Sequence, residues 1–189
     1  MFQRIPQYGG SMISIDIPNF AQRFPDLAAQ LSGEELNAMF HAFDVLEVGA
    51  EEALIAEGTI TDVLYLVWDG KLAVSMNTPY GEQNIAQVGP GAFLGEVSLM
   101  DPGPATASVT TQEGCTVLAL NHQQLEILWQ GHPRLATIFL RRLAQVIADR
   151  IRASNSYLDE IISEQSPVLP PDVVVEAHTL LYQSGKASS

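Results

Sequence analysis

The chain is poor in cysteine, in basic residues and in long apolar runs, and each shortage excludes a class of protein. Its 189 residues include one cysteine, Cys115, so no disulfide can form within the chain. Nine Lys and Arg stand against 22 Asp and Glu, and this formal charge of −13 argues against non-specific binding to nucleic acid or anionic membranes. No stretch is apolar for long enough to span a bilayer or to serve as a secretory signal. We therefore expect a cytoplasmic protein that does not associate with a membrane.

Motifs for catalysis and for metal binding are also lacking. The histidines are His41, His122, His132 and His178, and none falls in a predicted strand, where a metal-binding barrel enzyme would need a His-x-His cluster. No G-x-S-x-G elbow or other nucleophile context is present. Cys115 has no histidine close by in sequence and is interpreted as a small core residue. We predict no catalytic residues, no metal site and no enzymatic activity.

The distribution of charge is more informative than its total. Between positions 43 and 120 there are eleven acidic residues and a single base, Lys71, which gives a charge of −10. Five of the nine bases lie instead on the segment that follows: Arg134, Arg141, Arg142, Arg150 and Arg152. The middle of the chain is thus predicted to be electronegative, while the cations lie on a neighbouring helix.

The first 43 residues divide into an extension and a helical segment. Residues 1–24 form the predicted N-terminal extension, which we expect to be irregular as far as Pro18. Over residues 25–43 the apolar spacing predicts two short helices, and Ser32-Gly33-Glu34-Glu35 is typical of the start of the second. These helices should pack one apolar face on the part of the chain that follows.

Residues 43–120 change to short alternating runs separated by Gly, Pro and Asn, which is typical of a β-sandwich or barrel. Turns are predicted where an acidic residue or Tyr precedes Gly, as at Asp69-Gly70 and Tyr80-Gly81. The predicted strands are Phe43 to Val48, Ala53 to Ala56, Val63 to Trp68, Lys71 to Met76, Asn84 to Val88, Ala107 to Thr111 and Thr116 to Leu120.

Residues 121–165 return to helical spacing. Asn121 is predicted to cap a short helix, and Pro133 to open a long one, since proline is tolerated in a first helical turn. Two series of residues spaced by seven give the long helix a heptad-like seam: Leu140, Ile147, Ser154 and Ile161, and beside them Ala144, Ile151 and Leu158. We expect a homodimer through helix 133–165. Residues 166–189 form a Pro-rich tail that either docks on the dimer or binds a partner.

The segment from Gly91 to Val109 carries the most specific pattern in the chain. Gly91 and Gly95 allow unusual backbone conformations, and the residues from Glu96 to Met100 could form a helical turn with its N–H groups directed at an anion. The full stretch reads GAFLGEVSLMDPGPATASV. These features predict a backbone seat for an anionic group.

This stretch resembles the cassette of the cyclic-nucleotide-binding domain family, represented by the catabolite activator protein and the protein kinase A regulatory subunit. The family pattern is roughly F-G-E-(L/V)-(A/S)-L followed by P-R-(A/S/T)-A-(T/S)-V. One residue is inserted in the first half here, and Ala105 stands where the family has its phosphate-binding Arg. The resemblance, with further matches from about Leu31 to Leu158, implies an α+β, mainly β fold: a jelly-roll-type antiparallel β-barrel with N-terminal helices and a long C-terminal dimerisation helix.

The resemblance also implies the residues of a pocket. In the family the backbone of the cassette and the Arg hold the cyclic phosphate, and the Glu accepts a hydrogen bond from the ribose. Candidate helix contributions come from Arg142, Arg150 and Asn155. The candidate pocket residues are Phe93, Leu94, Gly95, Glu96, Val97, Ser98, Ala105, Thr106 and Ala107. Without the Arg, binding of cAMP or cGMP should be weakened or lost.

Two functions fit these features. In the first, residues 25–165 are a regulatory module that signals by helix movement and contact with a protein partner, with or without a small ligand. In the second, the pocket is vestigial and the protein is a dimeric scaffold. Direct DNA binding is not expected, because residues 166–189 contain a single base, Lys186, and are too short for a helix-turn-helix domain.

Overall fold

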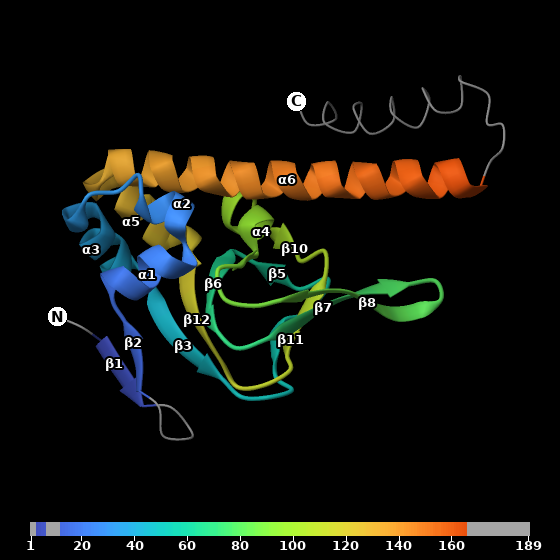
Figure 1. Cartoon of the computed structure of the whole chain (residues 1–189), viewed down its shortest axis with the longest axis horizontal. Coiled ribbons are helices and arrows are strands. Elements are labelled where there is room, and N and C mark those ends of the chain that lie inside the picture. The colour runs from blue at the N-terminus through green and yellow to red at the C-terminus, as the bar shows by residue number, and fades with distance from the viewer. Residues whose placement is uncertain (1–2, 7–11, 166–189) are drawn as a thin grey trace. The chain divides into compact units, whose positions relative to one another are not determined.

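A computed structural model describes residues 3–6 and 12–165 of the protein (Figure 1). By its internal contacts the chain divides into two units, residues 1–147 and residues 148–189. The first unit contains the sheets and nearly all of the helices. The long helix α6, Pro133–Gln165, begins in the first unit and ends in the second.

The N-terminal part of the chain is more ordered than its sequence predicts. Strands β1, Gln3–Pro6, and β2, Met12–Ile15, form an antiparallel pair, and helix α1, Ile17–Arg23, follows. The expectation of an irregular segment up to Pro18 was therefore wrong for the described residues. Asp16 caps α1 by accepting a hydrogen bond from the Asn19 N–H at 2.8 Å.

The two helices predicted over residues 25–43 are confirmed as α2, Pro25–Ala28, and α3, Gly33–Ala42. Ser32 and Glu35 form a reciprocal capping box at the start of α3: the Glu35 N–H donates to the Ser32 hydroxyl, and the Ser32 N–H donates to the Glu35 carboxylate. The local sequence thus fixes where α3 begins.

The strands pair into two four-stranded antiparallel sheets and smaller two-stranded pairs. In one sheet the order is β3-β12-β6-β9, with bounds Asp44–Val48, Cys115–Asn121, Val63–Asp69 and Phe93–Leu94. In the other the order is β4-β11-β7-β8, with bounds Ala53–Ile55, Ser108–Thr111, Leu72–Thr78 and Gly81–Val88. The short strands β5, Ile60–Thr61, and β10, Gly103–Pro104, pair with each other. All seven predicted strands are present; β5, β9 and β10 are additional to them, as are β1 and β2.

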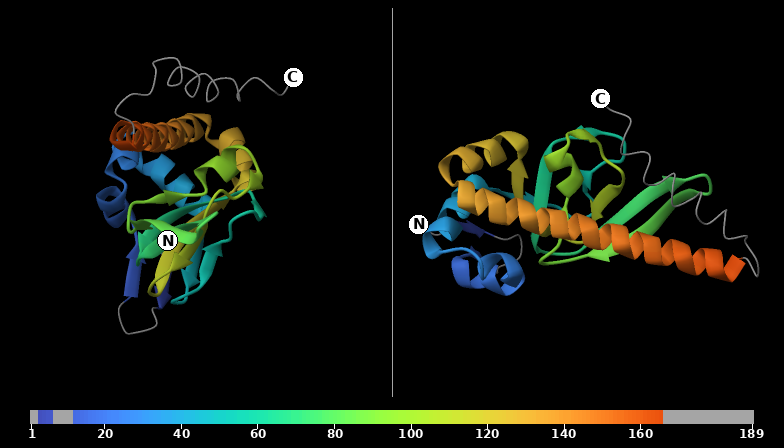
Figure 2. Two further views of the ribbon diagram at one scale, coloured as in Figure 1. Left: turned by 90° about the vertical axis from the view of Figure 1, so that its right-hand side faces the viewer. Right: turned by 90° about the horizontal axis from the view of Figure 1, so that it is seen from above.

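The sheet β3-β12-β6-β9 is the middle layer of the first unit, because two of its strands are buried on both faces. In β6, Leu64, Leu66 and Trp68 pack into a core cluster with the helices, while Val67 packs into a second cluster with residues of the other sheet. β12 divides in the same way, which explains why its sequence reads as a nearly continuous apolar run. Helices α1, α2 and α3 lie at one end, and the β7–β8 hairpin extends away from them (Figures 1 and 2).

Helix α5, His122–Gly131, begins at a second capping box, formed by Asn121 and Gln124. Helix α6 follows after His132, and its first part contributes buried Leu135, Phe139 and Leu143 to the cluster with the helices. Both helices were predicted from sequence at these positions.

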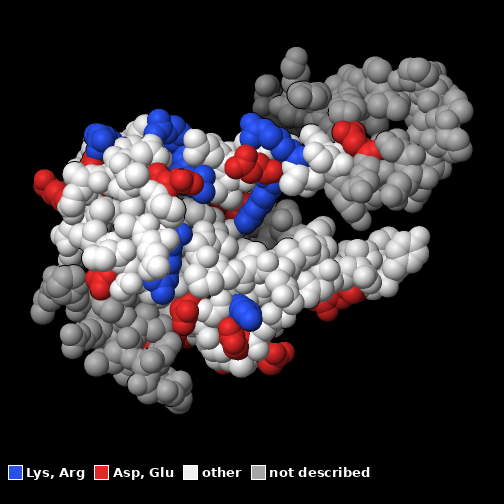
Figure 3. All heavy atoms as spheres, in the orientation of Figure 1, with Lys and Arg blue, Asp and Glu red and all other residues white. Residues whose placement is uncertain are grey.

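The observed architecture confirms an α+β fold of antiparallel sheets and helices. Among the described residues, hydrogen-bonded pairing joins the strands into separate sheets and closes no continuous barrel. Most of the visible surface in Figure 3 is uncharged, with acidic and basic groups scattered over it. None of the helices in the described part of the chain is long and apolar enough to cross a membrane.

Candidate functional site

The predicted seat is built on a tight approach between two backbone segments. Gly95 has φ +79°, and a Cβ atom at this position would lie 2.3 Å from the Val63 carbonyl oxygen of β6. Only glycine satisfies both the left-handed conformation and the close contact. Gly91 is also left-handed, at φ +90°, and its backbone lies against the Arg23 carbonyl. The two glycines thus set the path of the chain into and out of β9.

The helical turn predicted after Gly95 is confirmed as α4, Glu96–Met100. The first hydrogen bond of the helical turn runs from the Leu99 N–H to the Gly95 carbonyl at 3.0 Å. The N–H groups of the residues before Leu99 in the turn are not used by this ladder. Glu96 is 5% exposed and Ser98 is also buried, whereas Val97 is half exposed. The Glu96 carboxylate, which we predict to be the ribose acceptor, thus lies buried at the first helical position.

Ala105 lies inside the layer between the two sheets. Its side chain is 8% exposed and belongs to the apolar cluster that contains Val67, Leu94 and Cys115. Its backbone is fixed on both sides, because the Gly58 N–H donates to the Ala105 carbonyl at 2.8 Å and the Ala105 N–H donates to the Thr59 carbonyl at 2.9 Å. The position at which we predict that the family's Arg is replaced is therefore apolar and tied to the Gly58–Thr59 backbone.

The neighbours of Ala105 extend the cassette along β11. Thr106 is exposed and Ala107 is partly buried. The Ser108 hydroxyl accepts a hydrogen bond from the Glu57 N–H at 3.1 Å, and the Glu57 carboxylate accepts one from the Asn77 N–H at 2.8 Å. Polar groups in this part of the sheet are thus used to connect the β4–β5 turn with β7 and β11.

The titratable groups of the layer between the sheets are held neutral. Burial, and to a lesser extent the negative charge of Asp62, raises the pKa of Tyr65, whose strand neighbour is Leu94. Burial, followed by the charges of Asp69 and Glu52, raises the pKa of Cys115 to about 11. Cys115 is accordingly a protonated thiol at neutral pH, which agrees with its interpretation as a core residue rather than a nucleophile.

Of the residues predicted to assist from the long helix, Arg142 has partners on other elements. Arg142 pairs with Asp26 of α2 at 3.2 Å, and its guanidinium lies over the Phe93 ring, 5.9 Å from the centroid. Arg150 and Asn155 are exposed residues of the second unit, and their role in a pocket stays a prediction.

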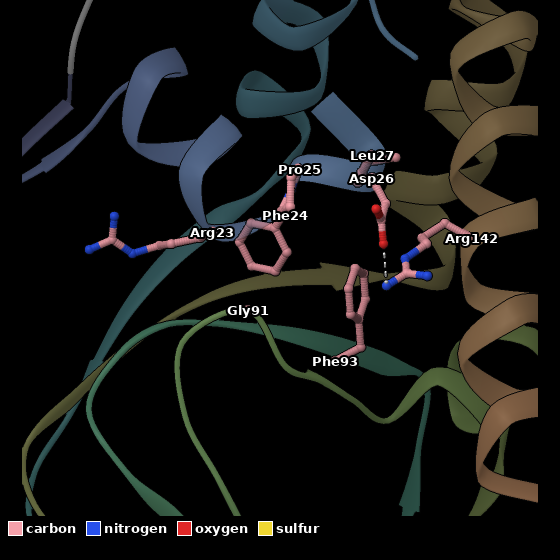
Figure 4. Close-up of a pocket in the computed structure, with 8 residues that line it drawn as sticks. All are labelled: Arg23, Phe24, Pro25, Asp26, Leu27, Gly91, Phe93 and Arg142. Carbon is pink, nitrogen blue, oxygen red and sulfur yellow. Dashed lines mark ion pairs between the residues drawn. The ribbon is translucent and has the colours of Figure 1, made fainter. Parts of the chain in front are cut away.

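A small cleft adjoins the first residue of the cassette. Arg142, Asp26, Phe24 and Phe93 line it together with Pro25 and Leu27, and its free volume is about 30 Å³ (Figure 4). A volume of this size holds about one water molecule. Figure 4 shows the Phe24 and Phe93 rings side by side in it, with Arg142 reaching from α6 toward Asp26, while Arg23 points away. The cleft therefore lies where α2, β9 and α6 meet, and it is too small for a nucleotide.

Arg23 was not singled out from the sequence, yet it ties α1 to the middle sheet. Its Nε donates to the Trp68 carbonyl at 2.7 Å, and its guanidinium stacks over the Trp68 ring at 4.5 Å. These residues are 45 positions apart, so no local pattern could have paired them. Within the described residues, no group of three or more His, Cys, Asp or Glu is placed to hold a metal ion.

Comparison with known proteins agrees with this geometry. Residues 45–132 match the sequence model of the cyclic nucleotide-binding domain. The chain belongs to this family. The match covers the two sheets, α4 and α5, so the cyclic nucleotide-binding domain includes both the seat and the position of the missing Arg. The long helix α6 follows the matched region.

Relatives of the cyclic nucleotide-binding domain include regulators and solved domains. The chain is 31% identical over 115 residues to the CRP-like cAMP-activated global transcriptional regulator of Mycobacterium tuberculosis, covering 60% of this chain and 50% of that protein. The N-terminal domain of a Streptomyces coelicolor transcriptional regulator is 33% identical, with a TM-score of 0.60, covering 75% of this chain and 96% of that one. A cyclic nucleotide-binding domain from Methylobacillus flagellatus is 27% identical with a TM-score of 0.70, covering 82% and 88%.

The chain spans about half the length of the M. tuberculosis regulator. The expectation that this protein does not bind DNA directly depends on residues 166–189, which lie outside the described residues, and it stays a prediction. What the comparisons establish is a regulatory family with a cyclic nucleotide-binding domain.

Proposed function

We propose that this protein is a regulatory module of the cyclic nucleotide-binding fold in which the family's usual cAMP binding is weakened or lost. Ala105 carries this proposal, since it replaces a phosphate-binding Arg with a methyl group packed in an apolar layer. A charge-assisted hydrogen bond to a phosphate is worth roughly 1.5–3 kcal/mol, which is about one to two decades of affinity. Residues 43–120 contain eleven acidic residues and one base, and this negative charge further repels an anion.

The module should act by helix movement and contact with a protein partner. An event at the seat would shift the population of α6 positions and so expose or hide a partner surface. We propose residues 25–165 as the functional domain, between the 1–24 extension and the 166–189 tail, with the seat carried by the two antiparallel sheets. A non-enzymatic, cytoplasmic role is part of this proposal.

A homodimer through α6 is the proposed assembly. Ile151 and Leu158 are spaced by seven on this helix and are 55% and 45% exposed, and large apolar side chains at heptad spacing suit a coiled-coil contact with a second copy. Replacing both by Glu should convert the dimer to a monomer in light scattering over a range of concentrations. A wild-type protein that is monomeric at all concentrations would contradict the proposed assembly.

The second candidate is a dimeric scaffold with a vestigial pocket, which the same exposed seam on α6 favours. Glu96→Gln distinguishes the two candidates, because it keeps the shape of the buried side chain and removes its charge. In the regulatory module this change alters partner binding or the thermal response to a ligand. In the scaffold it leaves partner binding unchanged.

The proposal is tested by a thermal-shift screen of purified protein against cAMP, cGMP, cyclic dinucleotides and linear nucleotides, confirmed by calorimetry. Weak or absent shifts with cAMP and cGMP are expected. A saturable shift at micromolar cAMP would contradict the weakened binding and would show that the backbone seat suffices without the Arg.

A further inference from the structure

Three arginines on the first part of α6 contact one short segment near the N-terminus. Arg134 forms an ion pair with both carboxylate oxygens of Glu35, and its other terminal nitrogen donates to the Gln30 carbonyl at 3.2 Å. Arg141 donates to the side-chain oxygen of the same Gln30. We refer to Arg134, Arg141 and Arg142, with their partners Asp26, Gln30 and Glu35, as the arginine clamp.

The clamp joins residues that are far apart in sequence, and a hydrogen bond within the N-terminal segment supports it. Arg134 and Glu35 are 99 positions apart, and Arg141 and Gln30 are 111 positions apart. The Gln30 side chain donates to the Asp26 carbonyl at 2.6 Å, which connects the middle of the segment to its first partner. α2 and the start of α3 are thereby fastened to α6 at successive points, and their positions are interdependent.

The last member of the clamp reaches the cassette. Arg142 pairs with Asp26 at 3.2 Å and lies over the ring of Phe93, the first residue of β9. The Phe93 ring in turn meets Phe24 edge-on, with the centroids 5.5 Å apart (Figure 4). Phe93 therefore contacts α6 through Arg142, and contacts the residue before α2 directly.

Phe93 also stands at the boundary between the two core clusters. Its ring packs in the cluster with the helices, while its neighbour Leu94 packs between the sheets with Ala105. Gly95 follows, locked against the Val63 carbonyl. A shift of the backbone at Gly95 should therefore be felt at Phe93, because only Leu94 separates the two residues.

We propose that the arginine clamp couples the seat to the helices, with Asp26 as a positioning residue that holds Arg142 over Phe93. This inference rests on the proposed function, since it supplies the route by which an event at the seat would reach α6. The route runs along the backbone from Gly95 through β9 to Phe93, and then through side-chain contacts from the Phe93 ring to Arg142 and Asp26.

The test is hydrogen exchange on the full chain without any nucleotide, comparing wild type with Asp26→Asn. Asn keeps the shape of the side chain and removes its charge, so the pair with Arg142 is lost. Because Asp26 is 67% exposed and Arg142 25% exposed, the pair should be worth little in isolation. We expect amide exchange in residues 91–100 and in the first part of α6 to rise by about twofold to fivefold.

Asp149→Asn is the matched control. It breaks an exposed pair with Arg152 on the same helix, at 2.8 Å, and neither residue of this pair belongs to the clamp. Exchange in residues 91–100 should stay at the wild-type rate in this variant. A change confined to residues 25–30 in Asp26→Asn, or an equal rise in both variants, would overturn the coupling.

A conservative variant keeps the test independent of folding defects. Asp26→Glu retains a carboxylate partner for Arg142 and leaves the guanidinium available to lie over Phe93, so exchange in residues 91–100 should stay near the wild-type rate. A rise in Asp26→Glu equal to that in Asp26→Asn, with both variants folded, would also overturn the proposal. The exchange experiment uses no nucleotide, so a negative ligand screen does not affect its interpretation. Nucleotide binding without the exchange effect would reject only the coupling through the clamp.

Discussion

The two sheets and the first part of α6 differ in their content of basic residues. Residues 43–120 carry one base, Lys71, and the site where the family has its Arg is occupied by buried Ala105. The first part of α6 carries three arginines, and each has an acidic or amide partner on α2, α3 or the loop between them. Of these arginines Arg142 contacts the cassette, at Phe93, but all three serve as structural ties between α6 and the segment of α2 and α3. Recruiting Arg142 to a phosphate would cost its pair with Asp26.

The largest effect is expected where α6 joins the core. Phe139 is fully buried and meets Phe43 edge-on, with the ring centroids 6.0 Å apart. Phe139→Ala should lower the free energy of unfolding by about 3–5 kcal/mol in chemical denaturation. Ile127→Ala, on the exposed face of α5, should change it by less than about 0.5 kcal/mol. Equal effects would mean that α6 is not part of the folded core.

Comparing two glycines with the same φ distinguishes the free-energy cost of a left-handed conformation from the cost of a close contact at the seat. Gly95 and Gly58 both have φ +79°, but a Cβ at Gly95 would lie 2.3 Å from the Val63 carbonyl oxygen, while one at Gly58 would meet nothing within 4 Å. Gly58→Ala should cost about 1–2 kcal/mol for the left-handed conformation alone. Gly95→Ala should cost about 1–3 kcal/mol more, measured by urea unfolding. If the two costs are equal, the seat is not a close-packed element.

The clamp predicts a specific dependence on pH. Hydrogen bonds from Arg134, with help from Ser32, lower the pKa of Glu35 from 4.5 to about 2. A carboxyl whose pKa is lower in the folded state stabilises the fold above its unfolded pKa and loses that contribution as the pH falls from about 4.5 toward 2. The difference in melting temperature between wild type and Glu35→Gln should therefore shrink over this range. A constant difference would show that the ionised carboxylate does not contribute.

Much of the fold followed from local sequence, and the clamp did not. Ser32-Gly33-Glu34-Glu35 and Asn121 marked the starts of α3 and α5, and alternation and turns gave the strands. The unusual backbone at Gly91 and Gly95 and the helical turn α4 were also predicted, because glycine at a left-handed position leaves a signal in the sequence.

Contacts between distant residues left no such signal. Arg134 to Glu35, Arg142 to Asp26 and Arg23 to Trp68 each join elements whose proximity depends on the whole topology. The short strands β5, β9 and β10 contain two residues each, so no alternation could reveal them. The order in the N-terminal residues was missed because buried Phe20 and Phe24 are stabilised by the rest of the core.

Calorimetry of cAMP and cGMP with wild type and Ala105→Arg tests the central claim most directly. If the seat lacks only its cation, the variant should bind at least about tenfold more tightly than wild type, which corresponds to about 1.4 kcal/mol. Ala105→Leu, which adds bulk without charge, is the control and should bring no gain. Equal affinity of the arginine variant and wild type, with the variant folded, would contradict the account, because it would show that the surviving backbone is not a phosphate seat.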